Sequence, residues 1–352
     1  MNAHRFTHLA AALVVALTAT AAHAVTIDWV TVGDPGNAGE TQTYSGTAMT
    51  FGAVADSFQI MKYEWTNSQY VDFLNAVDPN GTNPNSIYNT SMGSDARGGI
   101  SFTSGNSGGS KYAAKTNMGD KPVNYVSWFD AARVANWLHN GQGSGSTETG
   151  AYTLNNATTG TAPAVDSGAR FYIPTEDQWY KAAYYKGGST NADYWVYGTQ
   201  SDTAPTTVTS GPTGIGSAGS SGNFANCNRT ADWNGQDGNV TTVGTNGGGS
   251  AYGLYDMSGN VQEWNDLTGA AGSTRGLRGG SFNATGTTLS MSSSSRNPTP
   301  NFANDLFTAG FRLASPASSP SGVPEIDPAG MGSVLALVAG TLAWLERRRL
   351  AA

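Results

Sequence analysis

The most restrictive feature of this sequence is a set of three short amphipathic segments, each opened by an N-terminal capping box. The boxes are Thr66–Gln69, Ser127–Asp130 and Thr175–Gln178. In such a box, an N-cap hydroxyl and a side chain three residues later satisfy backbone amides that the first helical turn leaves unpaired. Apolar residues follow at helical spacing, and Gly141 and Gly187 end the second and third segments. The sequence therefore predicts three short helices.

Around these helices, short apolar stretches alternate with turns rich in Gly, Asn and Ser. Long polar stretches at 79–119, 141–168 and 199–222 are expected to be surface loops. Eight of the nine tryptophans lie between residues 25 and 323, so this body has the large apolar side chains that a core needs. We expect a loop-rich α+β domain with about three helices. The predicted strands are Phe58–Tyr63, Phe171–Ile173, Val240–Val243, Gly253–Met257 and Gly310–Leu313.

The body contains one cysteine, Cys227, and one histidine, His139. An intrachain disulfide is therefore excluded within it, and so are zinc and iron sites that need several Cys or His ligands. A thiol–imidazole pair of these two residues has no support in the local sequence. His139 falls in the last turn of the second predicted helix, where the helix dipole favours a cation. The body's 14 basic and 22 acidic residues argue against nucleic acid and anionic membranes as partners.

Residues 1–24 have the three parts of a secretory signal peptide. Arg5 supplies the positive start, Leu9–Leu17 is the apolar run, and Ala22–Ala24 is a small-x-small cleavage site. The apolar run is too short to cross about 30 Å of hydrocarbon, which argues against a membrane anchor. We expect cleavage after Ala24 and export from the cytoplasm.

The C-terminal end is organised as a second signal. A Ser/Pro linker at 316–323 precedes a tail at 324–352, which has an acidic motif, a short apolar run and Arg347–Arg349. This order resembles the PEP-CTERM sorting tail, here in a Val-Pro-Glu-Ile-Asp form that begins at Val323. The resemblance implies an exosortase-type enzyme as a partner and sorting to the cell envelope, the cell surface or the exterior. A plain tail anchor, with its arginines on the cytoplasmic side, is the alternative.

Six motifs of the body resemble one family when they are taken in order. They resemble the formylglycine-generating, or sulfatase-modifying-factor, domain over about residues 27–314. The resemblance implies a C-type-lectin-like variant with short antiparallel strands, and we assign the domain to 25–315. The related ergothioneine-pathway sulfoxide synthases add a helical domain whose histidines hold iron, and this chain has neither. The motifs are KYEWTNSQYVDFLNA, PVNYVSWFDAARVANWL, RFYIPTEDQWYKAAYY, SAYGLYDMSGNVQEWNDL, RGGSF and AGFRLA.

The catalytic centre of the family's oxidases is missing from the corresponding stretch. Those oxidases convert a sulfatase cysteine to formylglycine with two copper-binding cysteines in a Cys-x4-Cys-x2-Arg arrangement. When this chain is aligned on Arg296, the two positions hold Thr288 and Ser293. Hydroxyls cannot replace soft thiolates on Cu(I), so no copper is expected, and Cys227 belongs to a different motif. The serine run is expected to be a polar surface loop.

The expected calcium sites of the family, unlike its copper site, keep their ligand residues in this sequence. Around a Gly-Asn turn, two carboxylates and inward-facing carbonyls supply the oxygens that Ca²⁺ prefers. The resemblance implies one site at the side chains of Asp256 and Glu263 and the carbonyls of Gly259 and Val261. It implies a second at the side chains of Asn226 and Asp237 and the carbonyls of Cys227 and Asn239. The alternative is that these residues only hold turns, with Asp and Asn bonded to their own backbone.

Two further patterns have structural explanations. Arg278–Phe282 resembles the core signature of the family, and its glycines let strands approach closely. No helix follows it, which argues against a phosphate-binding loop. Asp130, Glu176 and Asp177 are carboxylates in capping boxes, and that position accounts for them without catalysis.

The sequence favours an exported, non-catalytic protein that displays loops for binding a peptide, protein or glycan. The lectin-like variant serves this purpose in phage and bacterial variable proteins, so the inference is one of analogy. The competing hypothesis is an enzyme, either a divergent formylglycine-generating oxidase or another metal-dependent oxidase on the same scaffold. A structural coat protein, without a ligand pocket near Ser292–Arg296, is a third.

Overall fold

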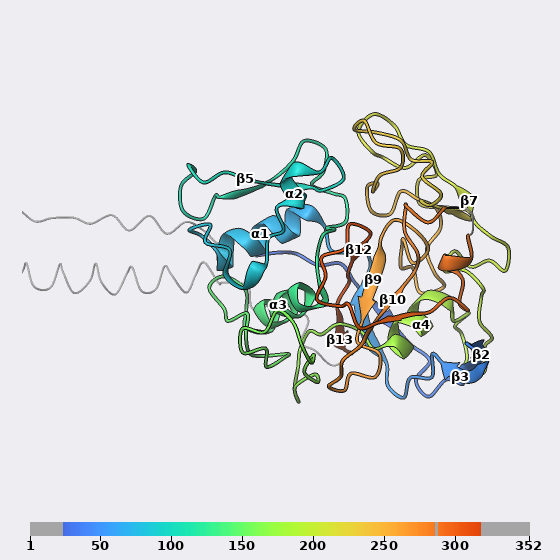
Figure 1. Ribbon diagram of the computed structural model, residues 1–352. Helices are drawn as coiled ribbons and strands as arrows, with labels where there is room; N and C mark the ends of the chain where they lie inside the picture. The colour runs from blue at the N-terminus through green and yellow to red at the C-terminus, as the bar shows by residue number, and fades with distance from the viewer. Residues whose placement is uncertain (1–23, 286–287, 318–352) are drawn as a thin grey trace, which may run out of the picture.

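The computed structural model describes residues 24–285 and 288–317 (Figure 1). The predicted signal peptide, apart from Ala24, and the predicted sorting tail lie outside the described residues. Within the described residues, no helix is long and apolar enough to cross a membrane. The final strand, β13, ends at Pro316, one residue beyond the expected domain boundary at 315.

The three predicted helices are confirmed, and each has its capping box. They are α1 (Asn67–Val77), α3 (Trp128–His139) and α4 (Glu176–Tyr184). Helix α4 ends before the predicted glycines, because Tyr185 is extended and pairs with Tyr194. The polar stretches also contain short elements that the sequence did not indicate: η1 (Pro84–Ser86) and α2 (Ser91–Ser94).

Short strands form two main sheets. One sheet has the order β1-β4-β13, with β1 at Trp29–Val32, β4 at Phe58–Met61 and β13 at Ala314–Pro316. The other has the order β11-β10-β9-β12, and its strands are Asn297–Thr299, Arg275–Arg278, Gln262–Asn265 and Ala309–Gly310. Three two-stranded sheets complete the fold: β2 (Glu40–Tyr44) with β3 (Thr47–Phe51), β5 (Ile100–Phe102) with β6 (Tyr112–Ala114), and β7 (Thr206–Thr207) with β8 (Phe224–Ala225).

The predicted fold class is therefore confirmed, whereas the strand predictions were partly wrong. Phe58–Tyr63 contains β4. Of the predicted strand Gly310–Leu313, Gly310 ends β12, and residues 311–313 connect it to β13. The prediction at Phe171–Ile173 yields one isolated pairing, between Tyr172 and Ala314. The structure describes Val240–Val243 and Gly253–Met257 but places neither in a strand. In the latter, Asp256 has φ of 59°, a left-handed conformation that no strand accommodates.

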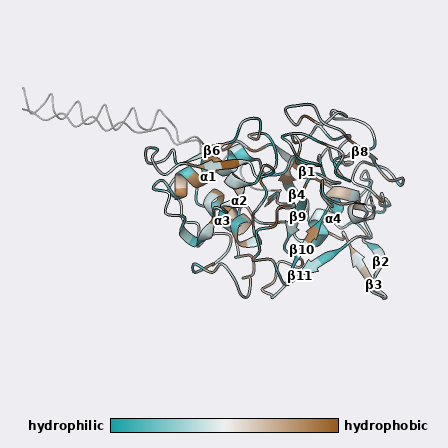
Figure 2. Cartoon of the chain, turned by 45° about the horizontal axis from the view of Figure 1, so that its top comes forward, coloured by the Kyte–Doolittle hydropathy of each residue, from teal (hydrophilic) through white to brown (hydrophobic). Residues whose placement is uncertain are grey.

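The four-stranded sheet stands between two hydrophobic cores. In Figures 1 and 2, α1 and α3 lie on one side of β9 and β10, and α4 lies on the other. Successive residues of a strand point to opposite faces. Accordingly, Trp264 belongs to the core around α1 and α3, while its neighbour Glu263 bonds to Trp179 of α4. The alternation along β9 thus places a carboxylate beneath α4.

Both ends of the domain are held firmly. Val25 is buried, its backbone N–H donates to Gln142 Oε1 over 2.6 Å, and Gln142 Nε2 donates back to the Val25 carbonyl. At the other end, β13 pairs with β4, which also pairs with β1. The first and last strands of the domain are thus attached to the same central strand.

Candidate functional site

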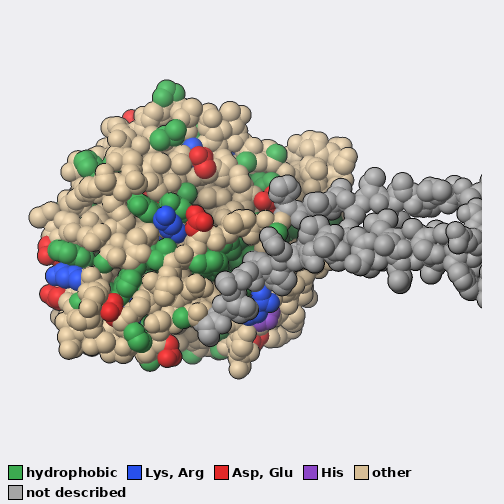
Figure 3. Space-filling model, turned by 180° about the vertical axis from the view of Figure 1, so that it is seen from behind, with side chains coloured by type: hydrophobic (Ala, Val, Ile, Leu, Met, Phe, Trp, Pro, Cys, Tyr) green, Lys and Arg blue, Asp and Glu red, His purple; other side chains and the backbone are tan. Residues whose placement is uncertain are grey.

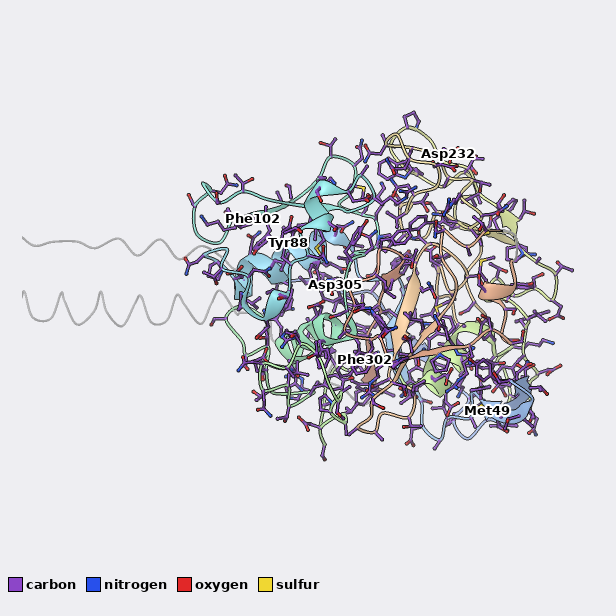
Figure 4. The ribbon with its side chains drawn as sticks, viewed as in Figure 1. Met49, Tyr88, Phe102, Asp232, Phe302 and Asp305 are labelled. Atoms are coloured by element: carbon purple, nitrogen blue, oxygen red, sulfur yellow. The ribbon has the colours of Figure 1, made fainter. Side chains whose placement is uncertain are left out.

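The serine run lies against a hairpin and the start of α4. We use the term serine-run face for Ser290–Arg296, the β2–β3 hairpin and the first turn of α4. Gln42 of β2 donates to Ser293 Oγ over 3.4 Å, and the Tyr184 hydroxyl donates to the Met291 carbonyl over 3.0 Å. Met49, at one edge of Figure 4, marks the position of the hairpin. Segments about 250 residues apart in sequence thus form one surface.

Two arginines fasten this face to the first residue of α4. Arg278 Nε donates to Glu176 Oε1 over 2.9 Å, and Arg296 Nη2 lies 2.7 Å from Glu176 Oε2. Arg278 also donates to the carbonyls of Ser293 and Ser295. Glu176 is almost fully buried. Its carboxylate is therefore engaged in holding the serine run, rather than in the helix capping that the sequence predicted.

Aromatic rings complete this arrangement. The guanidinium of Arg296 lies 5.5 Å from the ring centres of Tyr44 and Phe51, both in the hairpin. The guanidinium of Arg278 lies 5.0 Å from Phe51 and 4.9 Å from Tyr180. Cation–π contacts of desolvated guanidiniums are stronger than those in water. These contacts fix the hairpin and the serine run relative to each other.

The two positions that hold cysteines in the oxidases carry hydroxyl residues here. Thr288 opens η2 (Thr288–Met291), and Ser293 is buried, with its hydroxyl bonded to Tyr180 and Gln42. In the part of the chain that the structure describes, no group of three or more His, Cys, Asp or Glu side chains is placed to hold a metal ion.

Cys227 lies closer to this face than its place in the sequence indicated. It packs in a small cluster with Met291, Tyr197 and Ala225. Burial raises the pKa of its thiol to about 11. A protonated, 1% exposed thiol is neither a good nucleophile nor a good metal ligand. Cys227 thus lies near the serine run although it belongs to a different sequence motif, and its thiol is unreactive.

His139 lies in the last turn of α3 as predicted, but its expected charge was wrong. Its Nδ1 accepts a hydrogen bond from the backbone N–H of Arg170 over 3.1 Å. Burial, together with the nearby Arg170 charge, lowers the pKa of His139. The imidazole is therefore neutral near pH 7 and serves as a hydrogen-bond acceptor.

The residues of the first expected calcium site are buried and already engaged by N–H donors. Asp256 accepts from the Gly244 amide and from Asn246, over 2.6 and 2.8 Å. Glu263 accepts from Arg312 through both oxygens, over 2.6 Å each, and from Trp179 over 2.8 Å. Each Asp256 oxygen keeps a lone pair for a cation, whereas Glu263 Oε2 already accepts two bonds. The fit to calcium is therefore better at Asp256 than at Glu263.

The second expected site has one clear unsatisfied ligand. Asn226 is fully buried, and its Oδ1 has no hydrogen-bond partner among the described residues. Its Nδ2 donates to the Asn239 carbonyl over 2.9 Å, so these two expected ligands lie together. The Cys227 carbonyl accepts from Thr230. Asp237 is exposed and its carbonyl accepts from Arg97. An orphaned amide oxygen beside a carbonyl is the part of this site that fits a hard cation.

Glu64 joins the two sites and was not singled out from the sequence. It is fully buried, accepts from Asn260 Nδ2 over 2.7 Å and from the Val261 amide over 3.1 Å. Asn260 Oδ1 in turn accepts from Asn226. Burial, with the charges of Asp256 and Glu263, raises the pKa of Glu64 well above its usual value. Its place inside the first family motif was the available signal, but no local pattern distinguishes it from a surface residue.

Comparison with known families agrees with this architecture. Residues 23–317 match the sulfatase-modifying factor enzyme 1-like domain, and the chain belongs to that family. No curated protein shows significant similarity to it.

Several solved structures are similar at a low level. Treponema denticola variable protein 1 is 20% identical, with a TM-score of 0.47 and coverage of 84% of this chain and 96% of that one. CarF is 23% identical, with a TM-score of 0.43 over 83% and 99% of the two chains. PvdO from Pseudomonas aeruginosa is 19% identical, with a TM-score of 0.41 over 82% and 92%.

The buried Glu263–Arg312 pair supplies a first prediction. We expect Arg312→Met to lower the free energy of unfolding by about 3–5 kcal/mol, because it leaves a buried carboxylate unpaired. The double variant Glu263→Gln, Arg312→Met is expected to recover part of that loss. Urea unfolding of the three proteins measures both effects.

The Lys186–Asp193 pair, at 3.6 Å and with an exposed carboxylate, is the matched control. Lys186→Met is expected to change the free energy of unfolding by about 1 kcal/mol at most. An Arg312→Met protein as stable as the wild type would contradict a dominant role for the buried pair.

Proposed function

We propose that this chain is an exported, non-catalytic binding or display domain whose ligand contacts the serine-run face. The observation that carries the proposal is the hydrogen bonding of Ser293 and of the backbone around it. Where the oxidases need a cysteine, a buried Ser293 hydroxyl is bonded to Tyr180 and Gln42, and two arginines hold the surrounding backbone. The face has a fixed shape, and its serine run contains no cysteine.

The surface chemistry favours a peptide or protein segment over a glycan as the ligand at this face. The β2–β3 hairpin is a two-stranded sheet, and Thr41, Thr43 and Thr50 are exposed along it. An exposed sheet edge offers backbone groups to an extended peptide, with side-chain pockets giving specificity. On the molecular face in Figure 3, basic side chains are few and most lie beside acidic ones, so no basic patch forms there, which supports the argument against nucleic acid.

A binding assay and an activity assay together test the proposal. We expect Ser294→Arg, a change at an exposed position of the serine run, to abolish capture of peptides from a displayed random library. Asp193→Asn, away from the run, is the control and should retain capture. We also expect no conversion of a cysteine-containing sulfatase peptide to formylglycine, with or without copper, as followed by mass spectrometry.

Turnover by the unmodified protein would replace the binding proposal with the oxidase hypothesis. The variant Thr288→Cys, Ser293→Cys is the informative companion. We expect it to gain Cu(I) binding relative to the wild type, since thiolates are the ligands this metal prefers.

We further propose that calcium stabilises the domain. At the first site it would be held by Asp256 and Glu263 and the carbonyls of Gly259 and Val261. At the second, Asn226 and Asp237 and the carbonyls of Cys227 and Asn239 would hold it. The unsatisfied Asn226 Oδ1 and the concentration of buried carboxylates around Glu64 support this. Calcium would neutralise charge that the described protein compensates only with Arg312.

Melting curves with calcium and with chelator test this metal. A ligand that binds only the native state adds about 2.7 kcal/mol at a hundredfold excess over Kd. Asp256→Ala and Asn226→Ala should each lose most of the gain. Asp193→Asn, outside both sites, should keep it. Identical wild-type midpoints under the two conditions would eliminate the metal.

We also propose export and tail processing, with an exosortase-type enzyme as the partner. The firm attachment of Val25 to Gln142 supports a domain that begins there. Intact-mass measurement of protein from the native host is expected to show a chain that starts at Val25 and has lost the tail beyond the 323–325 region. Retention of Arg347–Arg349 would instead indicate a plain anchor.

A further inference from the structure

A polar cavity at the start of α3 lies outside the serine-run face and both calcium sites. It has a volume of about 200 Å³. Ser86 and Thr159 are exposed residues of its wall, so it opens to solvent, while Phe129 lies buried at its base. Ligand pockets for drug-sized molecules are larger, about 300–1,000 Å³, so this cavity suits a single ring. In Figure 4, Asp305 in its wall is well separated from Met49 of the hairpin.

Two carboxyl groups, those of Asp130 and Asp305, interact in the cavity wall. Asp130 uses Oδ2 to accept from the Ser127 amide and hydroxyl, over 2.8 and 2.7 Å. Its carboxyl group is also hydrogen-bonded to that of Asp305, which accepts from Asn89 over 2.9 Å. A hydrogen bond between two carboxyl groups requires that one is protonated. Burial and the charge of Asp305 raise the pKa of Asp130 to about 7, which is consistent with one shared proton.

An unsatisfied cationic donor lines the same cavity. Arg133 is fully buried, and its Nε and Nη2 pair with Glu148 over 2.9 and 3.3 Å. Its Nη1 has no hydrogen-bond partner in the described part of the chain. A buried N–H group without an acceptor costs about 1–3 kcal/mol, and more when it is charged. A ligand that accepts a hydrogen bond from Arg133 Nη1 would therefore remove this cost.

The cavity wall also contains residues in an unusual backbone conformation. Asn85 and Ser86 have φ of 55° and 57°, and Asn85 Nδ2 donates to Glu148 over 3.0 Å. Residues other than glycine rarely adopt this left-handed region, and such residues cluster at ligand-binding sites. The contact with Glu148 links this wall to the ion pair of Arg133.

The required ligand must both donate and accept hydrogen bonds. An ammonium group or a metal ion does not fit, because neither can accept a hydrogen bond from Arg133 Nη1. A phosphate has the acceptors but meets the Asp130–Asp305 pair with like charge. A neutral hydroxyl group both donates and accepts, and a sugar ring carries several such hydroxyls.

We propose that this cavity binds one pyranose unit of a carbohydrate, with its hydroxyls bridging the Asp130–Asp305 pair and Arg133. The site is independent of the peptide-binding face proposed above. It uses no calcium and lies on the α3 side of the four-stranded sheet.

Titration calorimetry with a panel of methyl pyranosides tests the site. The panel contains the gluco, galacto, manno and L-fuco compounds, at up to high millimolar concentration. We expect saturable binding of at least one, unaffected by calcium chelation. Asp305→Asn is expected to weaken it about tenfold, because it exchanges a charge-assisted acceptor for a neutral amide. Thr159→Trp, at the exposed rim, should block entry and leave the carboxyl pair intact.

Asp193→Asn is the charge-matched control and should bind as the wild type does, and melting curves confirm that each variant is folded. A glycan array then separates recognition of a free sugar from recognition of a chain terminus. The proposal is overturned if no pyranoside binds the folded protein, or if binding survives both Asp305→Asn and Thr159→Trp. It is also overturned if methylammonium or calcium binds there and pyranosides do not compete.

Discussion

The ion pair between Glu263 and Arg312 is the interaction on which most of this architecture depends. It lies fully buried, and it joins β9 to the chain segment that leads into β13. Trp179 of α4 donates to the same carboxylate. Arg312 also donates to the carbonyl of Met61, the last residue of β4, and to the carbonyl of Tyr255. Both main sheets and α4 are thus oriented by one charge pair. Desolvation of the two charges offsets much of their attraction, so the main effect of the pair is to fix geometry. Removal of one partner is expected to lower the free energy of unfolding.

A loop-rich chain without disulfides needs other means of ordering its backbone, and asparagine side chains supply many of them. Asn67 donates to three carbonyls at 118–122, and Asn136 ties α3 to the loop at 147–152. Asn226 and Asn260 do the same in the polar core between the candidate calcium sites. Each amide both donates and accepts, so it can satisfy backbone groups that no strand reaches. The high content of polar uncharged residues therefore builds structure here and is not a sign of disorder.

The sequence predicted what is encoded locally and missed what depends on distant partners. A capping box is complete within four residues, so α1, α3 and α4 were predictable. The β2–β3 hairpin also had a local signal that the prediction overlooked. Ser45 and Gly46, both with positive φ, form a two-residue turn between the paired strands. Strands of two residues, such as β7 and β8, are too short to show any period. In the site, Glu176 was assigned as a capping residue, yet its partners Arg278 and Arg296 are 102 and 120 residues away. No spacing rule connects them, and the same holds for Glu64 and for the Asp130–Asp305 pair.

The sharing of β4 by the first and last strands has a mechanical consequence. Ala314, Ser315 and Pro316 pair with Ile60, Gln59 and Phe58, and β1 pairs with the other edge of the same strand. A force applied to the chain beyond Pro316 therefore loads β13 before any other element. Three residue pairs resist that force, and the next charged anchor behind them is Arg312. A domain tethered at this end and pulled by flow or by a bound partner would transmit tension straight into its buried ion pair, while the loops that display its surface remain unloaded.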